Sequence, residues 1–188
     1  MLPRVSLSLA AMAGVLVCAQ VQAANILANP GFETGALAPW FAQSGAPTVS
    51  STDVHSGNFS CAAFGDDEIR QNFAPVLTSQ ITEVSAWVKR PPFQFDQYSF
   101  YYSDAPTFTG VIQGNSSNFD QFNLTANLTA GAHLTGFSIF GTSSGPAFLD
   151  DFVINVVPEP SSALALAAIG GAAISRRSSR LRGIAVPL

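Results

Sequence analysis

Few side chains in this sequence could act as nucleophiles or general bases. The chain contains two histidines, His55 and His133, and each lies in a stretch of turn-forming residues. Nucleophilic catalysis requires a base beside the nucleophile, and Cys61 has no recognisable partner of this kind. A zinc site would require more nitrogen and sulfur ligands than these residues supply. A carboxylate pair for glycoside hydrolysis has no fixed spacing in sequence, but the absence of an activated group argues against an enzyme.

Aromatic rings on polar strand faces could instead bind a sugar by stacking. Residues 82–89 alternate with period two, which puts Trp87 on the face opposite the apolar positions 84, 86 and 88. Residues 95–102 place Tyr101 on one face with Gln97 and Ser99. We therefore interpret Trp87 and Tyr101 as a candidate ligand-binding platform across one sheet. The alternative is that both rings belong to the core, because tryptophan is usually well buried.

The elements that position these rings are predicted to be strands. From residue 25 to 156, helix-forming residues are scarce and Gly, Ser, Thr, Asn and Phe dominate. Further strands are expected at 118–128 around Phe122 and Leu124, at 134–140 with Thr135, Phe137 and Ile139 on one face, and at 148–156 with Phe152, Ile154 and Val156 on one face. Turn clusters separate these runs, which is typical of a β-sandwich. Two packed sheets are expected to bury most of the fifteen phenylalanines.

The charge of the segment between the two ends of the chain excludes one class of partner. Residues 24–156 contain eleven acidic residues and only three basic ones, Arg70, Lys89 and Arg90. Nucleic-acid binding requires clustered cations, so nucleic acid is not an expected partner. The acidic run Asp66-Asp67-Glu68 is interpreted as a solvent-facing turn. Cys61 alone cannot form an internal disulfide, so the domain must rely on its core or on a metal ion.

The N-terminus, residues 1–23, is predicted to be a signal peptide. Met1 to Arg4 form a short positive region, an apolar run follows, and Val21-Gln22-Ala23 fits a small-residue cleavage site. A lipoprotein signal ending at Cys18 is the alternative, but Val17 directly before the cysteine fits it badly. We expect Ala24 to begin a single domain that extends to Val156.

The C-terminus contains a three-part pattern. Val157-Pro158-Glu159-Pro160 is followed by an apolar run, residues 161–175, and then by the basic residues Arg176, Arg177 and Arg180. Residues 157–182 resemble the PEP-CTERM sorting signal of exosortase substrates, with 183–188 as an extra tail. The resemblance implies an exported protein whose short apolar helix is inserted transiently in the inner membrane and then processed by an exosortase. Fifteen residues are fewer than the roughly twenty of a full span, so complete crossing stays open.

The domain itself has a second resemblance. Asn29-Pro30-Gly31-Phe32-Glu33-Thr34-Gly35, Val54-His55-Ser56-Gly57, residues 84–89 and Leu149-Asp150-Asp151-Phe152-Val153-Ile154 are similar, in this order, to motifs of calcium-containing jelly-roll carbohydrate-binding modules. The resemblance implies an all-β jelly-roll sandwich with its first and last strands side by side. It also implies a structural calcium held by Glu33 and by Asp150 or Asp151, with backbone carbonyls near Gly31 and Ser56. Oxygen ligands of this kind are those that calcium prefers.

These observations lead to an expected role at the cell surface or in the extracellular matrix. We interpret the protein as a non-enzymatic structural or adhesive component associated with exopolysaccharide. A glycan-binding module with a structural calcium is the alternative, and a carbohydrate-active enzyme is the least favoured interpretation.

Overall fold

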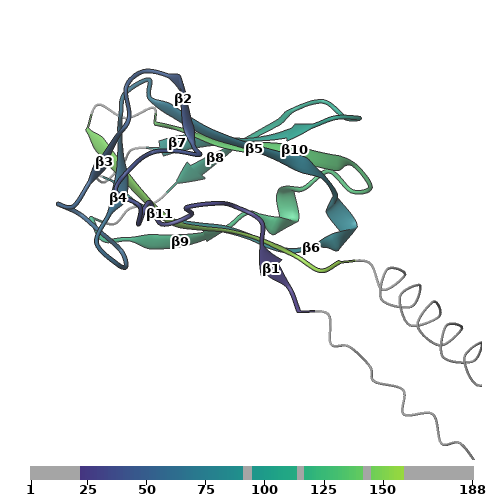
Figure 1. Cartoon of the computed structure of the whole chain (residues 1–188). Coiled ribbons are helices and arrows are strands. Elements are labelled where there is room, and N and C mark those ends of the chain that lie inside the picture. Colours follow the sequence, from purple (N-terminus) through teal and green to yellow (C-terminus); the bar gives the residue numbers. More distant parts are fainter. Residues whose placement is uncertain (1–21, 91–94, 114–116, 142–144, 159–188) are drawn as a thin grey trace, which may run out of the picture.

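The computed structural model describes residues 22–90, 95–113, 117–141 and 145–158, and within them the chain folds into two antiparallel sheets (Figure 1). The first sheet contains, in spatial order, β3 (Thr48–Ser50), β4 (Ser60–Phe64), β11 (Pro146–Val156), β6 (Ile81–Lys89) and β9 (Asp120–Asn123), with β1 (Ala24–Asn25) also paired to β11. The second contains β2 (Phe41–Ser44), β5 (Glu68–Leu77), β10 (His133–Gly141), β7 (Phe95–Tyr102) and β8 (Phe108–Gln113). Two short 3-10 helices, η1 (Thr78–Gln80) and η2 (Thr125–Asn127), follow β5 and β9. This architecture confirms the predicted all-β jelly-roll sandwich.

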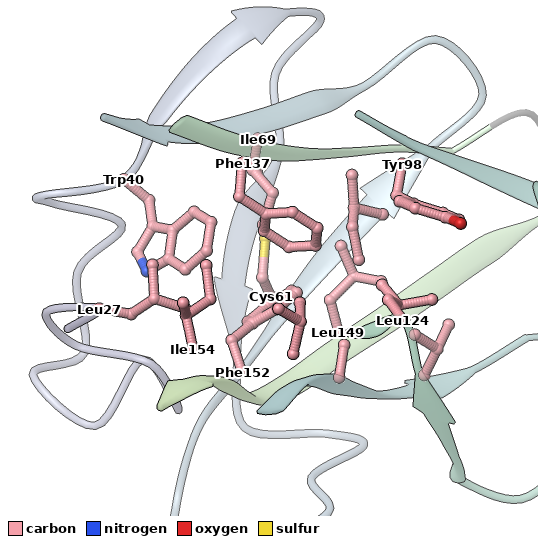
Figure 2. Packing of buried hydrophobic residues seen from close by; sticks show 14 of the residues in the cluster. Leu27, Trp40, Cys61, Ile69, Tyr98, Leu124, Phe137, Leu149, Phe152 and Ile154 are labelled. Atoms are coloured by element: carbon pink, nitrogen blue, oxygen red, sulfur yellow. The ribbon is translucent and has the colours of Figure 1, made fainter. Parts of the chain in front are cut away.

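The core lies between the two sheets and has aromatic rings at its centre (Figure 2). The ring of Phe152 lies 4.8 Å from that of Trp40 and 5.9 Å from that of Phe137, centroid to centroid. Of the described phenylalanine side chains, Phe32, Phe100, Phe137 and Phe152 are fully buried, and only Phe41 and Phe64 are exposed. The others are partly buried, and several of them pack against the core.

Strand β11 changes its inward-facing side partway along its length. Ala147 and Leu149 face the core before residues 150–151, and Phe152 and Ile154 face it afterwards. The pairing register with β6 shifts between Asp150 and Val153, and Asp151 has φ 45°. This irregularity is a bulge that inserts an extra residue into the alternation. It explains why a single alternating face does not describe residues 148–156.

Two other strands differ from their predicted patterns. In β10 the register shifts between Leu134 and Gly136, so Leu134 is buried on the same side as Phe137 and Ile139. Thr135, expected on that face, is only partly buried and donates its hydroxyl to the carbonyl of Tyr101 at 3.0 Å. Of the strand predicted at 118–128, the structure contains only β9, and the 3-10 helix η2 occupies the second half of that range.

The two ends of the domain lie side by side. Ala24 pairs with Val156, and the backbone N–H of Ile26 donates to the carbonyl of Ile154 at 3.0 Å. The N–H of Val157 donates to the carbonyl of Gln80 at 2.9 Å, so the contacts of the domain continue to the residue directly before the Pro-Glu-Pro box. The adjacency of the first and last strands is therefore confirmed.

Most of the two terminal signals lies outside the described residues. This applies to residues 1–21 of the predicted signal peptide, to Glu159, Pro160 and Arg176, Arg177 and Arg180 of the sorting signal, and to the tail 183–188. Among the described residues, no helix has the length and apolarity that a membrane span requires.

Gly110 provides a test of the packing between β7 and β8. It lies opposite Tyr98, whose buried ring would be 2.3 Å from a Cβ atom added at position 110. Replacing Gly110 with alanine is therefore expected to lower the free energy of unfolding by about 1–3 kcal/mol, because the ring must move or the strands must separate. Val111→Ala, on the same strand but half exposed, is the control. Chemical denaturation measures both, and equal stability of the two variants would contradict the packing.

Candidate functional site

The five residues proposed for a metal site gather around the bulge of β11, an interior strand of the first sheet. Gly31 packs so closely against the bulge of β11 that an added Cβ would lie 3.1 Å from Oδ1 of Asp151 and 3.3 Å from Oδ1 of Asp150. The same position lies 3.8 Å from Cγ of Glu33. Gly31 therefore leaves space between the carboxylates that a larger residue would fill.

Asp150 is the most buried member of this acid cluster. Its Oδ2 accepts the backbone N–H of His55 at 2.9 Å and of Ser56 at 3.3 Å, and its Oδ1 accepts the N–H of Asp151 at 2.8 Å. Burial raises the pKa of the Asp150 carboxyl, the N–H of His55 lowers it, and the charge of Asp151 raises it further. The fold thus places a carboxylate where its negative charge is incompletely offset.

Glu33 and Ser56 take different positions from those expected of direct ligands. The two oxygens of Glu33 each accept the backbone N–H of Asn58 at 3.0 Å, and Oε1 also accepts that of Phe59 at 3.1 Å. Gly57 has φ 69° and approaches Glu33 so closely that a Cβ would overlap its carboxylate. Glu33 therefore fixes the loop before β4, and Ser56 contributes its N–H to Asp150.

The fit of a calcium ion at the bulge of β11 rests on two carboxylates. Within the described ranges, no group of three or more His, Cys, Asp or Glu side chains is arranged to hold a metal ion. A cation between Asp150 and Asp151 would complete its shell with backbone carbonyls, which calcium accepts readily. Burial raises the pKa of Asp150, and a neighbouring cation would act in the opposite direction by favouring its charged form.

His55 lies beside the bulge of β11 and was not assigned to a site from the sequence. Its Nδ1 lies 2.7 Å from Oδ2 of Asp151, and its ring stacks on Trp87 with centroids 3.7 Å apart and planes 15° apart. Phe119 approaches the same imidazole at 5.5 Å. Trp87 is partly exposed on the outer face of the first sheet, as predicted, but His55 covers one face of its ring. The sequence signal that could have assigned His55 to this site was its position inside the motif Val54-His55-Ser56-Gly57.

Tyr101 lies at the centre of a polar network on the outer face of the second sheet. The guanidinium carbon of Arg70 lies 3.6 Å from the centroid of the Tyr101 ring. The Tyr101 hydroxyl donates to Oε1 of Glu68 at 3.0 Å, accepts from Nε2 of Gln43 at 3.3 Å, and lies 3.2 Å from Oγ of Ser138. Arg70 in turn donates to Gln43 at 3.0 Å and to Asn72 at 2.7 Å. We call Gln43, Glu68, Arg70, Asn72 and Tyr101 the Tyr101 face.

The proposed joint platform of Trp87 and Tyr101 is wrong. Trp87 belongs to β6 in the first sheet and Tyr101 to β7 in the second, and both side chains point outward. The two rings are thus on opposite outer faces of the sandwich. Alternation identifies which face of a strand is polar, but it does not assign strands to sheets.

Among the described residues, the thiol of Cys61 is inaccessible and the imidazole of His133 is paired with a carboxylate. Cys61 is fully buried, and burial followed by the charge of Asp67 raises the pKa of its thiol to about 12, so it stays protonated. His133 lies 2.6 Å from Asp104 at an exposed turn. Gly141-Thr142-Ser143-Ser144-Gly145 has the Gly-x-Ser-x-Gly spacing, but it joins β10 to β11, whereas a nucleophile elbow joins a strand to a helix.

The acidic run at 66–68 closes a turn. Asp67 accepts the backbone N–H of Ala46 at 2.7 Å and of Phe64 at 2.8 Å. It is buried, which corrects the expectation of a solvent-facing run. Glu68, at the start of β5, belongs to the Tyr101 face.

Comparison with known proteins supports both resemblances. Residues 156–180 match the PEP-CTERM protein-sorting motif. A family 61 carbohydrate-binding module in complex with β-1,4-galactotriose is similar in structure, with TM-score 0.52, 19% identity, and coverage of 72% of this chain and 99% of that chain. A family 16 carbohydrate-binding module is also similar, with TM-score 0.53, 14% identity, and coverage of 69% of this chain and 98% of that chain. A xylan-binding domain of family 22 is similar too, with TM-score 0.51, 13% identity, and coverage of 71% of this chain and 96% of that chain. No curated protein sequence matches the chain significantly.

These similarities define the two parts of the chain. At such low identity the solved structures show the fold alone, and that fold is the β-sandwich of carbohydrate-binding modules. The sorting motif implies export, transient membrane anchoring and processing by an exosortase. The chain therefore carries a PEP-CTERM sorting motif, which implies export and exosortase processing, behind a β-sandwich with the fold of carbohydrate-binding modules.

Proposed function

We propose that the exported domain binds a glycan on the Tyr101 face. The observation that supports this most directly is the polar network around Tyr101, which gathers an arginine, a carboxylate and two amides on one outer surface. Gln43 and Asn72 are exposed and Arg70 and Glu68 are partly exposed, so a ligand can reach them. Sugar hydroxyls both donate and accept hydrogen bonds, and this face offers donors and acceptors side by side.

The proposed mode of binding relies on hydrogen bonds more than on ring stacking. Arg70 already covers one face of the Tyr101 ring at 3.6 Å. A sugar would therefore contact the guanidinium edge, the carboxylate of Glu68 and the amides, where charge-assisted bonds are the strongest available. One similar structure holds β-1,4-galactotriose and another is named xylan-binding, so we propose a β-linked polysaccharide as the ligand.

Glycan-array binding of the mature domain tests this proposal. Replacing Arg70 with alanine is expected to weaken binding roughly tenfold or more, because a charge-assisted hydrogen-bond donor is lost. Arg70→Lys should recover only part of the affinity, since an ammonium cannot reproduce the planar fork. Glu83→Gln, on the outer face of the first sheet, is the control and should bind normally. Unchanged binding by a folded Arg70→Ala variant would exclude the Tyr101 face.

A structural or adhesive role in an exopolysaccharide matrix is the second candidate. The sorting motif favours it, because the processed protein is exported beyond the inner membrane. Such a protein would need no glycan affinity of its own, so a folded domain that binds no glycan on the array would support it.

We also propose a structural calcium between Asp150 and Asp151. The close approach of the Asp150 and Asp151 carboxylates to Gly31 supports this site. The ion would stabilise the bulge of β11 and would take no part in sugar binding on the other sheet.

A further inference from the structure

We propose that the end of the sandwich from which both chain termini emerge is a docking surface for the enzyme that processes the sorting signal. This surface, which we call the exit end, consists of residues 75–82 and 124–132 together with the start of β1 (Figure 1). Residues 75–82 include η1, and residues 124–132 include η2. The role of the exit end depends on the sorting motif and is independent of glycan binding on the Tyr101 face.

The sorting motif begins inside the folded sheet. Its match starts at residue 156, the last residue of β11, which pairs with Ile81 of β6. The N–H of Val157 donates to the carbonyl of Gln80 at 2.9 Å, and Pro158 follows directly. No linker therefore separates the domain from the Pro-Glu-Pro box. Because an extended residue spans only about 3.5 Å, an enzyme that binds the box must lie against the exit end.

Both ends of the domain leave it on the same side. Ala24, the predicted first residue after the signal peptide, pairs with Val156, and Figure 1 shows β1 beside the end of β11. The motif implies that the segment after the box is transiently anchored in the membrane. The exit end therefore faces that membrane while the chain is anchored, and an enzyme that cuts beside an anchored segment must work there.

The exit end contains a cavity next to the start of the motif. The cavity is about 250 Å³ in volume, and its lining includes Ser79, Ile81, Leu128 and Ala130. Ile81 is both a wall of the cavity and the register partner of Val156. Ile81 and Leu128 supply apolar surface, while Ser79 and Ala130 are exposed. An apolar side chain of a partner could therefore be buried here, as anchor residues are in protein interfaces.

The absence of charge favours a protein partner over a lipid surface. Residues 75–82 and 124–132 contain no Asp, Glu, Lys or Arg, although residues 24–156 contain eleven acidic and three basic residues. Glu83 and Asp104 lie outside these segments and are engaged by other side chains. The cores of protein interfaces are depleted of charged residues. Anionic lipid surfaces attract clustered Lys and Arg, which the exit end lacks.

Pulse-chase measurement of processing of the full-length protein in its own host tests the docking surface. Ala130→Arg and Ser79→Arg should each be processed several-fold more slowly, because a long charged side chain blocks the cavity. Ala46→Arg is the matched control and should be processed at the wild-type rate. Ala46 is also exposed but contacts Asp67, at the opposite end of β5 from η1. Wild-type rates for both cavity variants, or equal slowing by Ala46→Arg, would overturn the proposal.

Insertion of Gly-Ser-Gly-Ser between Val157 and Pro158 separates docking from simple crowding. The insertion adds up to roughly 14 Å of chain, so an enzyme at the box is no longer held against the exit end. Processing should slow several-fold, and Ala130→Arg should then have little further effect. Wild-type or faster processing of the insertion variant would show that the domain only obstructs the enzyme.

Two further measurements complete the test. Faster processing of Ala130→Arg than of the wild type would assign the exit end to anionic lipid and overturn enzyme docking. The melting temperatures of the three arginine variants should equal that of the wild type, because all three positions are exposed. Alanine at Pro158, Glu159 and Pro160 should block processing in every variant, so a failure of the sorting signal itself is seen separately.

Discussion

Replacing Pro158, Glu159 and Pro160 with alanine is expected to abolish release of the protein to the cell surface. The match of residues 156–180 to the sorting motif implies that an exosortase acts on this segment. Without the box, the apolar run and the basic residues after it should hold the chain in the inner membrane, with the arginines on the cytoplasmic side. The effect should be close to all-or-none, because the processing step itself is lost.

Mass spectrometry of the surface form measures this outcome. In the wild-type protein the tail from about Pro158 onward should be missing, while peptides up to the end of β11 should be present. Glu83→Gln, which changes a charge on the folded domain alone, should be processed like the wild type. Recovery of peptides spanning Ser161 to Arg176 from wild-type surface protein would contradict the account.

Removing calcium with EDTA is expected to lower the melting temperature of the mature domain by on the order of ten degrees. An ion that binds only the folded state stabilises it by RT ln(1 + [L]/Kd), about 2.7 kcal/mol at a hundredfold excess over Kd. Calcium should restore the melting temperature. Magnesium should restore less, because it requires a smaller octahedral shell and retains its waters.

The pH dependence and two variants sharpen this test. Because the pKa of Asp150 is raised in the fold, protonation of Asp150 favours the folded state below its unfolded pKa, and that contribution is lost as pH rises through the folded pKa. The EDTA effect should therefore be larger at neutral pH than in acid. Asp151→Asn should remove most of the response and Glu33→Gln should reduce it, whereas Asp104→Asn should keep it. A melting temperature insensitive to EDTA would leave the acid cluster as a structural feature of the bulge.

Regular alternation predicted the fold most reliably where a strand runs without interruption. In β6, positions 84, 86 and 88 are buried and Trp87 is on the outer face, as the sequence pattern indicated. The failures occur at irregularities: the bulge at Asp150-Asp151 and the register shift after Leu134 each move later residues to the other face. A one-residue insertion reverses the alternation, and nothing in the side-chain pattern marks where it occurs.

Only part of the candidate site could be predicted from the sequence. Gly31, Glu33, Asp150 and Asp151 were found through motif resemblance, and the pairing of β1 with β11 brings their segments together. The Tyr101 face depends on which strands are neighbours in the second sheet, since Gln43, Glu68 and Tyr101 come from β2, β5 and β7. Such long-range pairing leaves no local signal in the sequence. Tyr101 was identified, but its partners were not.

Binding of the mature domain to exopolysaccharide purified from its own organism tests the central claim most directly. The wild-type domain should co-sediment with the polysaccharide, and Arg70→Ala, matched in melting temperature, should lose most of the bound fraction. If the folded wild-type domain stays in the supernatant, or if Arg70→Ala binds as well as the wild type, glycan recognition on the Tyr101 face is contradicted.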